Sequence, residues 1–166
     1  MKKRLRDTLI VICLVVYVGC FFGCSSGEKG DRGFVPVSRA EAEAFAKPLI
    51  AKFNQGDKTP FYDFATGLDA SLALTYYARL NTPGSKKKSR EHTAEDRKIF
   101  AETTMAVNKN FFDMVSQVEI AEIKEEYGTF CVVLDCKIKQ RSNPLKTDLK
   151  LLKKKSTDEI VVASRM

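Results

Sequence analysis

Apolar and polar residues follow three successive patterns along the chain. Residues 9–23 form an apolar run without a charged side chain. Between residues 38 and 114 the apolar residues recur every three to four positions, which is the spacing of an amphipathic helix. From about residue 118 they alternate with polar residues, which is the pattern of a half-buried strand. The chain therefore predicts an apolar N-terminal segment, then helices, then strands.

Residues typical of helix ends predict four helices in the middle of the chain. Ser38 and Glu41 form a capping box, and Gly56 stands where the helix that follows should end. Pro48 lies inside this helix and predicts a kink or a break, because a proline in a helix interior costs about 3 kcal/mol. The starts of the other three helices are marked by Thr59-Pro60, by Asp69 and by Thr93 with Asp96.

The alternation is clearest between residues 130 and 138. One face carries Phe130, Val132, Leu134, Cys136 and Ile138, and the other carries Cys131, Asp135, Lys137 and Lys139. Tyr127-Gly128 precedes this strand as a turn, and further strands are expected at residues 118–123, 149–151 and 160–163. Helices followed by strands predict an α+β domain over residues 38–166, with the helices packed on one face of an antiparallel β-meander.

Cys131 and Cys136 are expected to be two separate packed thiols. They are five positions apart on one predicted strand, so their side chains should point to opposite faces. At about 3.3 Å per residue their Cα atoms would lie about 16 Å apart, beyond the roughly 7 Å that a disulfide can bridge. The spacing therefore argues against both a disulfide and a shared metal site.

The first 23 residues have the features of a signal peptide. Four of residues 1–6 are basic, and the apolar run that follows is shorter than the roughly 20 residues needed to cross a bilayer comfortably. Residues 24–37 are expected to form a flexible tether, because residues 25–33 are small, charged or glycine. An alternative is a signal that is not cleaved, which would make the chain a single-pass membrane-anchored protein.

The end of the apolar run resembles the signal of bacterial lipoproteins. It carries two glycine-cysteine pairs, Gly19-Cys20 and Gly23-Cys24. The lipoprotein pattern favours leucine three residues before the cysteine, whereas this chain has Tyr17 and Phe21 there. Cys24 is the preferred lipidation site because the tether follows it directly. The resemblance implies a lipid-anchored protein of the bacterial cell envelope, with its domain outside the cytoplasm and fatty acyl chains such as palmitate on Cys24.

The domain resembles the nuclear-transport-factor-like, cystatin-like cone fold. The matching features are Phe53-Asn-Gln-Gly56-Asp57, Phe61-Tyr62-Asp63-Phe64 and the terminal meander. Enzymes that resemble ketosteroid isomerase use this cone to pair a carboxylate with tyrosine or protonated-acid donors in an apolar pocket. The residues that could imitate such a site are Tyr62, Asp63, Tyr76 and Tyr77. Tyrosines also commonly bury the ring and leave the hydroxyl in water, which is the alternative interpretation.

Composition narrows the choice of partners. Removing residues 1–23 lowers the formal charge from +7 to about +4, and the basic runs, including Lys86-Lys87-Lys88-Ser89-Arg90, have no interleaved aromatic residues. Nucleic acid is therefore not expected as a partner, and the basic runs are expected to form a solvated face. The alternative is that the run at 86–90 contacts anionic lipid head groups near the tether. His92 is the only histidine and stands in a polar loop, and the glycines at 27, 30 and 33 follow no strand, so neither a metal nor a cofactor is expected.

These features favour a non-catalytic binding or interaction domain that takes an envelope protein or a small apolar ligand as its partner. The alternative is a small envelope enzyme that uses an apolar pocket in the cone. An apolar pocket with Asp63 or a tyrosine hydroxyl pointing into it would favour the enzyme. A filled cone with an exposed apolar sheet face would favour the interaction domain.

Lipidation can be tested by expressing the chain in a bacterium supplied with labelled fatty acid. We expect the protein to carry the label and Cys24→Ser to abolish it, because the thioether forms on that sulfur. Label that survives in Cys24→Ser but is lost in Cys20→Ser would place the modification at Cys20. A wild-type chain without label would favour the uncleaved membrane anchor.

Overall fold

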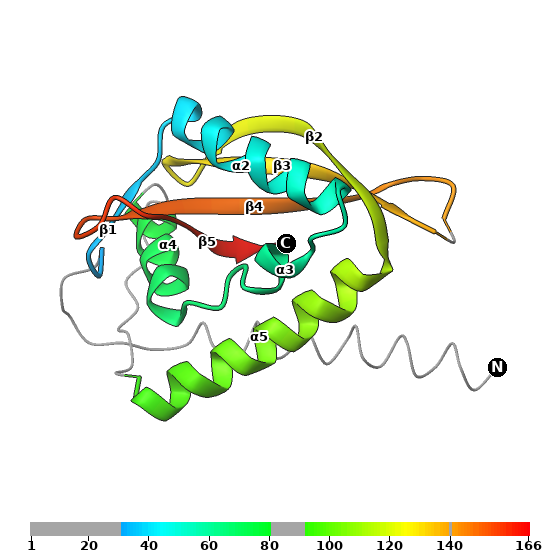
Figure 1. Cartoon of the computed structure of the whole chain (residues 1–166). Helices are drawn as coiled ribbons and strands as arrows, with labels where there is room; N and C mark the ends of the chain where they lie inside the picture. Colours follow the sequence, from blue (N-terminus) through cyan, green and yellow to red (C-terminus); the bar gives the residue numbers. More distant parts are fainter. Residues whose placement is uncertain (1–30, 81–91, 140) are drawn as a thin grey trace. The chain divides into compact units, whose positions relative to one another are not determined.

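The computed structural model describes residues 31–80, 92–139 and 141–166 (Figure 1). This part of the chain is α+β, with helices that precede an antiparallel sheet curled into a half-barrel. None of its helices is both long and apolar enough to cross a membrane. The elements in chain order are β1 (Phe34–Pro36), α2 (Arg39–Asn54), α3 (Thr59–Tyr62), α4 (Leu68–Leu80), α5 (Ala94–Met114), β2 (Val115–Glu126), β3 (Thr129–Ile138), β4 (Leu145–Lys154) and β5 (Ile160–Arg165).

Two helices begin with the capping boxes that the sequence predicts. The Ser38 and Thr93 side chains each accept a hydrogen bond from the backbone N–H three residues on, and the carboxylates of Glu41 and Asp96 accept one from the backbone N–H of the cap residue. The break expected at Pro48 is absent, because α2 continues through it. The side chain of Pro48 is exposed, and the buried residues on the other side of α2 hold the helix against the sheet.

Two predictions near the helices need correction. Asp69 lies inside α4 instead of capping it, and its carboxylate binds the guanidinium of Arg97 at 2.9 Å and that of Arg32 at 3.4 Å. Residues 34–36, expected to be part of the tether, form β1, which pairs with β4. The proposed signal, Cys20, Cys24 and the basic run at 86–90 lie outside the described residues.

The sheet is built around β4, which has neighbours along both edges. Lys153 of β4 pairs with Val35 of β1 and with Ile160 of β5, so β1 and β5 lie on opposite edges. β3 and β1 follow each other along the same edge of β4, and β2 lies beyond β3. The buried hydroxyl of Thr129 joins this junction, because it donates to the backbone oxygen of Leu151 at 2.7 Å and accepts from the backbone of Val37 at 3.1 Å.

The β2–β3 hairpin confirms the predicted turn. Tyr127 and Gly128 both have positive φ, +56° and +74°, as a two-residue type I′ turn requires. Along β3, Val132, Leu134 and Cys136 point into the main core, as expected from the alternation. Cys131 points to the opposite face and is also fully buried, so the two cysteines are separate packed thiols, as expected.

The sheet packs against helices on both faces, whereas the sequence predicts a single covered face. The larger apolar cluster includes Leu151 and Val162 together with buried residues of α2, α3 and α5. The smaller cluster includes Leu152 and Ala163 together with α4, whose small residue Ala73 is fully buried. Because neighbouring residues of a strand point to opposite faces, α4 covers the face opposite to α2.

The strand assignment of residues 130–138 predicts a specific order of substitution costs. Leu134→Ala should lower the free energy of unfolding by about 2–5 kcal/mol, because the fully buried side chain leaves a cavity. Val132→Ala should cost about 1 kcal/mol or more for the same reason. Lys137→Ala should change stability by less than about 0.5 kcal/mol, because its side chain is half exposed and its ion pair with Glu119 is solvated.

Urea denaturation of the full chain in detergent measures these differences. Val132→Ala is decisive, because in a helix residue 132 would lie on the side opposite to residues 130, 134 and 138. A near-zero cost for Val132→Ala beside a severe cost for Leu134→Ala would refute the strand.

Candidate functional site

Tyr62 binds α5 instead of facing a pocket. Its hydroxyl donates a hydrogen bond to Oδ1 of Asp113 at 2.6 Å, and Nζ of Lys109 lies 5.0 Å from the ring centroid. The hydrogen bond between the two groups raises the pKa of Tyr62 and lowers the pKa of Asp113. Tyr62 therefore stays protonated and links α3 to α5.

Tyr76 and Tyr77 lie on α4, on the side of the smaller apolar cluster. The hydroxyl of Tyr77 donates to the backbone oxygen of Phe34 at 2.9 Å, and burial raises the pKa of this hydroxyl. The rings of Tyr76 and Tyr77 meet edge to face with their centroids 5.5 Å apart. Tyr77 thus ties β1 to α4, and neither tyrosine shares a pocket lining with Asp63.

Asp63 lines a cavity in the described part of the chain. A cavity of about 380 Å³ lies between the α3–α4 connection and the strands β4 and β5. Its volume is within the range of small-ligand pockets. The apolar part of its lining comes from Phe34, Phe64, Ala70, Ile160, Val161 and Val162.

The polar groups of this cavity favour binding over catalysis. Nζ of Lys154 is 2.6 Å from the carboxylate of Glu159, so these two charges are paired. Asp63 is exposed, and its carboxylate has no hydrogen-bond or ion-pair partner among the described residues. A general base needs a donor or acid positioned beside it, and the lining contains none of the three tyrosines. The cavity can hold an apolar group and offer one carboxylate to it.

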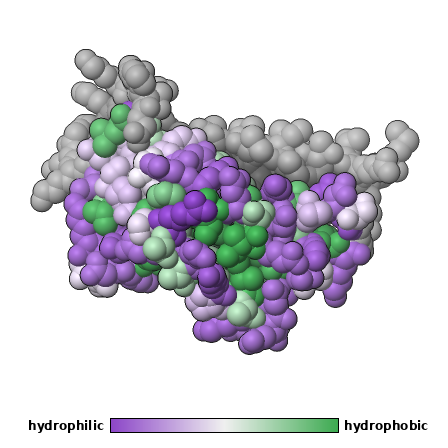
Figure 2. All heavy atoms as spheres, turned by 90° about the horizontal axis from the view of Figure 1, so that it is seen from above, coloured by the Kyte–Doolittle hydropathy of each residue, from purple (hydrophilic) through white to green (hydrophobic). Residues whose placement is uncertain are grey.

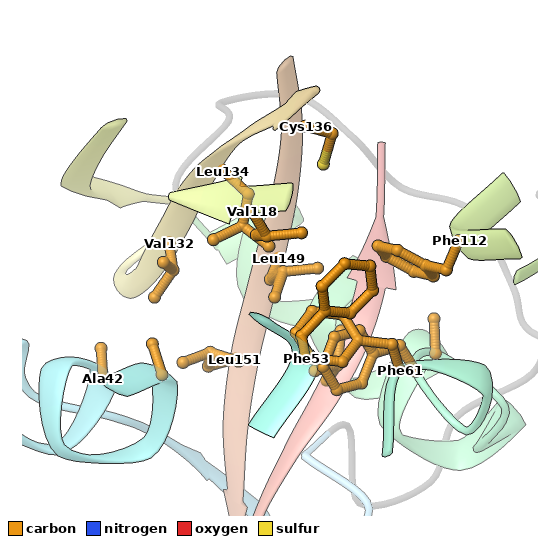
Figure 3. Packing of buried hydrophobic residues seen from close by; sticks show 14 of the residues in the cluster. Ala42, Phe53, Phe61, Phe112, Val118, Val132, Leu134, Cys136, Leu149 and Leu151 are labelled. Carbon is orange, nitrogen blue, oxygen red and sulfur yellow. The ribbon is translucent and has the colours of Figure 1, made fainter. Parts of the chain in front are cut away.

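The interior between the helices and the sheet is filled by phenylalanine rings (Figure 3). Phe53 of α2 and Phe112 of α5 both contact Phe61 of α3, with ring centroids 4.7 Å and 4.9 Å apart. Phe64 contacts Phe61 at 4.7 Å on its other side. All four rings are at most 5% exposed. These rings therefore form a packed core between the helices and the sheet.

A buried polar group beside these rings joins α5 to the end of the sheet. The amide nitrogen of Asn108 donates to the backbone oxygens of Tyr62 and Phe64, and its oxygen accepts from Nε of Arg165 at 2.8 Å. The guanidinium of Arg165 lies 4.5 Å from the ring centroid of Phe111, and burial lowers its pKa. No motif marks Asn108 or Arg165 in the sequence, because each is a single polar residue in an amphipathic pattern.

A second polar cluster lies on the outer face of the sheet. Glu126, Cys131 and Asp148 place one potential ligand atom each within 4.8 Å of one another, close enough to hold a metal ion. Two ammonium groups already balance the carboxylates: Nζ of Lys124 is 2.9 Å from Asp148, and Nζ of Lys150 is 3.2 Å from Glu126. The cluster is therefore an ion-pair network around a neutral thiol. The two lysine ammonium groups supply the positive charge that a metal ion would otherwise supply to the carboxylates.

The burial of Lys150 is the feature of this network that the sequence predicts least. Its side chain is only 1% exposed, and its ammonium group lies 4.3 Å from the centroid of the Tyr127 ring. A lysine that alternates with leucines on a predicted strand is expected to face water. Its position next to Cys131 across the β3–β4 ladder is set by strand register, which the sequence does not specify.

The state of Cys131 can be tested by alkylation with iodoacetamide. Burial raises its pKa to about 11, so roughly one thiol in ten thousand is ionised at neutral pH. We expect native Cys131 to react at least about 100-fold more slowly than in urea, as measured by peptide mass mapping. Rapid alkylation of the native protein that zinc suppresses would instead identify Cys131 as a metal ligand.

Comparisons of the chain with protein-family models, with curated proteins and with solved structures gave no match. Function is therefore argued from side-chain geometry. Among the described residues, that geometry comprises a packed core, candidate pocket residues that do not converge, a cavity of mixed polar and apolar lining with the unpaired carboxylate of Asp63, and a charge-balanced outer cluster.

Proposed function

We propose that this protein is a lipid-anchored component of the bacterial cell envelope whose α+β domain binds a partner and catalyses no reaction. The observation that carries the proposal is the packed interior. Phe53, Phe61, Phe64 and Phe112 pack against one another between the helices and the sheet, which supports a domain with a solid apolar core there. The candidate catalytic groups are also dispersed, since Tyr62 binds Asp113 and Tyr77 binds the backbone of β1.

The anchor is proposed from the sequence. The basic start, the apolar run to Gly23 and the glycine-cysteine pair support lipidation at Cys24, with the domain outside the cytoplasm. Cys20 is the alternative site, and an uncleaved single-pass anchor is the alternative form of attachment. The cystatin-like cone also belongs to this proposal, supported by helices that precede a curled antiparallel sheet.

The second candidate function is a small envelope enzyme that uses the cavity beside β5. One observation favours it: Asp63 lines this cavity, its carboxylate is unpaired, and much of the lining is apolar. The interaction role is preferred because no tyrosine in the described residues joins Asp63 there and because Lys154 is already paired with Glu159.

Ligand-induced stabilisation distinguishes the two functions. An extract of bacterial envelopes is separated by ultrafiltration into a small-molecule and a macromolecular fraction, and each is added to the full chain in detergent. We expect only the macromolecular fraction to raise the thermal midpoint, because a ligand that binds the folded state alone stabilises it. Asp63→Asn should respond like the wild type.

A midpoint that rises with the small-molecule fraction in the wild type, but not in Asp63→Asn, would contradict the interaction role. It would place the ligand in the cavity beside β5 and favour the enzyme.

A further inference from the structure

β2 leaves one long edge of the sheet open. The strand runs from Val115 to Glu126, and among the described residues it pairs with β3 alone (Figure 1). The edge formed by β5 is different, because the backbone N–H of Ala65 donates to the backbone oxygen of Val162 at 3.0 Å. An open strand edge presents backbone donors and acceptors that an added strand can pair with.

The Asn54 side chain shows how a peptide group fits this edge. Its Oδ1 accepts from the backbone N–H of Val118 at 3.0 Å, and its Nδ2 donates to the backbone oxygen of Val118 at 2.9 Å. One amide thus offers an acceptor and a donor to the same residue, as a neighbouring strand does. Over residues 120–125 no described residue outside β3 bonds to the backbone of β2.

Apolar side chains flank the open part of the edge. Ile120 and Ile123 of β2 and Phe45 and Leu49 of α2 are half-buried and pack on the main core. Figure 2 looks down on the molecule from the side where α2 and β2 lie in Figure 1, and it shows an apolar area bordered by polar side chains. A strand added here would cover apolar surface as well as pair its backbone.

The negative charge of this edge favours a positively charged partner. Glu122 and Glu125 are exposed and have no ion-pair partner among the described residues, whereas Glu119 is bound by Lys137 at 3.0 Å. The chain as a whole is basic, so this edge is a local concentration of negative charge. A second copy paired through the same edge would bring glutamates close to glutamates, which is unfavourable. A segment with lysine or arginine would be attracted.

We propose that residues 120–125 of β2 bind an extended basic segment of a partner protein as an added strand. Apolar residues of that segment would contact Ile120 and Ile123, and its alternating cations would lie next to Glu122 on the opposite face. Glu125 shares the face of Ile123 and would add to the negative charge that attracts the segment. The inference rests on the proposed interaction role and specifies where and what the domain binds.

The test uses the full chain in detergent and a fluorescent peptide of alternating lysine and valine, with binding followed by fluorescence anisotropy. We expect saturable binding that weakens with salt, because the glutamates are exposed. The same peptide with alternate backbone nitrogens methylated should not bind, since strand pairing needs its N–H groups.

Paired variants of the protein locate the site. Glu122→Gln combined with Glu125→Gln should weaken binding about fivefold. Glu102→Gln, which removes an exposed charge on α5, should leave it unchanged. Equal thermal midpoints of the variants and the wild type would exclude misfolding as the cause.

Three results would overturn the inference. Peptide binding that is indifferent to the double substitution and to methylation would place the interaction elsewhere and leave the interaction role intact. Absence of binding would remove the basic segment as the occupant. Self-association of the chain that the peptide displaces would identify a second copy as the occupant, as sedimentation velocity would show.

Discussion

The packing of Phe61 against Phe53, Phe64 and Phe112 is the contact on which the rest of the fold depends. These rings come from α2, from α3 and its following turn, and from α5, and they meet the sheet at Leu149 and Leu151 in one cluster (Figure 3). Their edge-to-face and tilted geometry adds to the burial of apolar area, which is the main stabilising term in such a core. The same contact therefore fixes the positions of three helices relative to the sheet.

Polar side chains then set the positions of the elements around this core. The ammonium group of Lys58 donates to the backbone oxygens of Phe112, at 2.9 Å, and Val115, and so satisfies the C-terminal end of α5. The side-chain amide of Asn108 donates to the backbone oxygen of Tyr62 at the end of α3 and accepts a hydrogen bond from Arg165 of β5. Glu41 joins the start of α2 to Lys153 of β4 at 2.8 Å. Each contact links a helix and a strand, or two helices, that are far apart in the chain. These contacts therefore restrict how the helices can be placed on the sheet.

Function follows from what these contacts leave unpaired. The interior is closed, the β5 edge is covered at Val162, and the outer cluster around Lys150 balances its own charges. Among the described residues, the backbone of β2 over residues 120–125 bonds only to β3, and Glu122 and Glu125 have no ion-pair partner. The proposed interaction role rests on these unpaired groups.

The sequence alone determined the features that arise from nearest neighbours along the chain. The capping boxes at Ser38 and Thr93, the Tyr127-Gly128 turn and the two faces of β3 each depend on a few consecutive residues, so local spacing predicts them. Only the tertiary structure decided that Pro48 stays within a continuous helix, that Asp69 binds Arg97 and that residues 34–36 join the sheet. The tertiary structure also separated the residues of the candidate pocket. Tyr62 binds Asp113, Tyr77 binds the backbone of β1, and Asp63 lines the cavity beside β5. Strand register and helix packing decide that Lys150 and Asn108 are buried and that one edge of β2 is unpaired among the described residues. Both depend on residues far apart in the chain, so no local pattern predicts them.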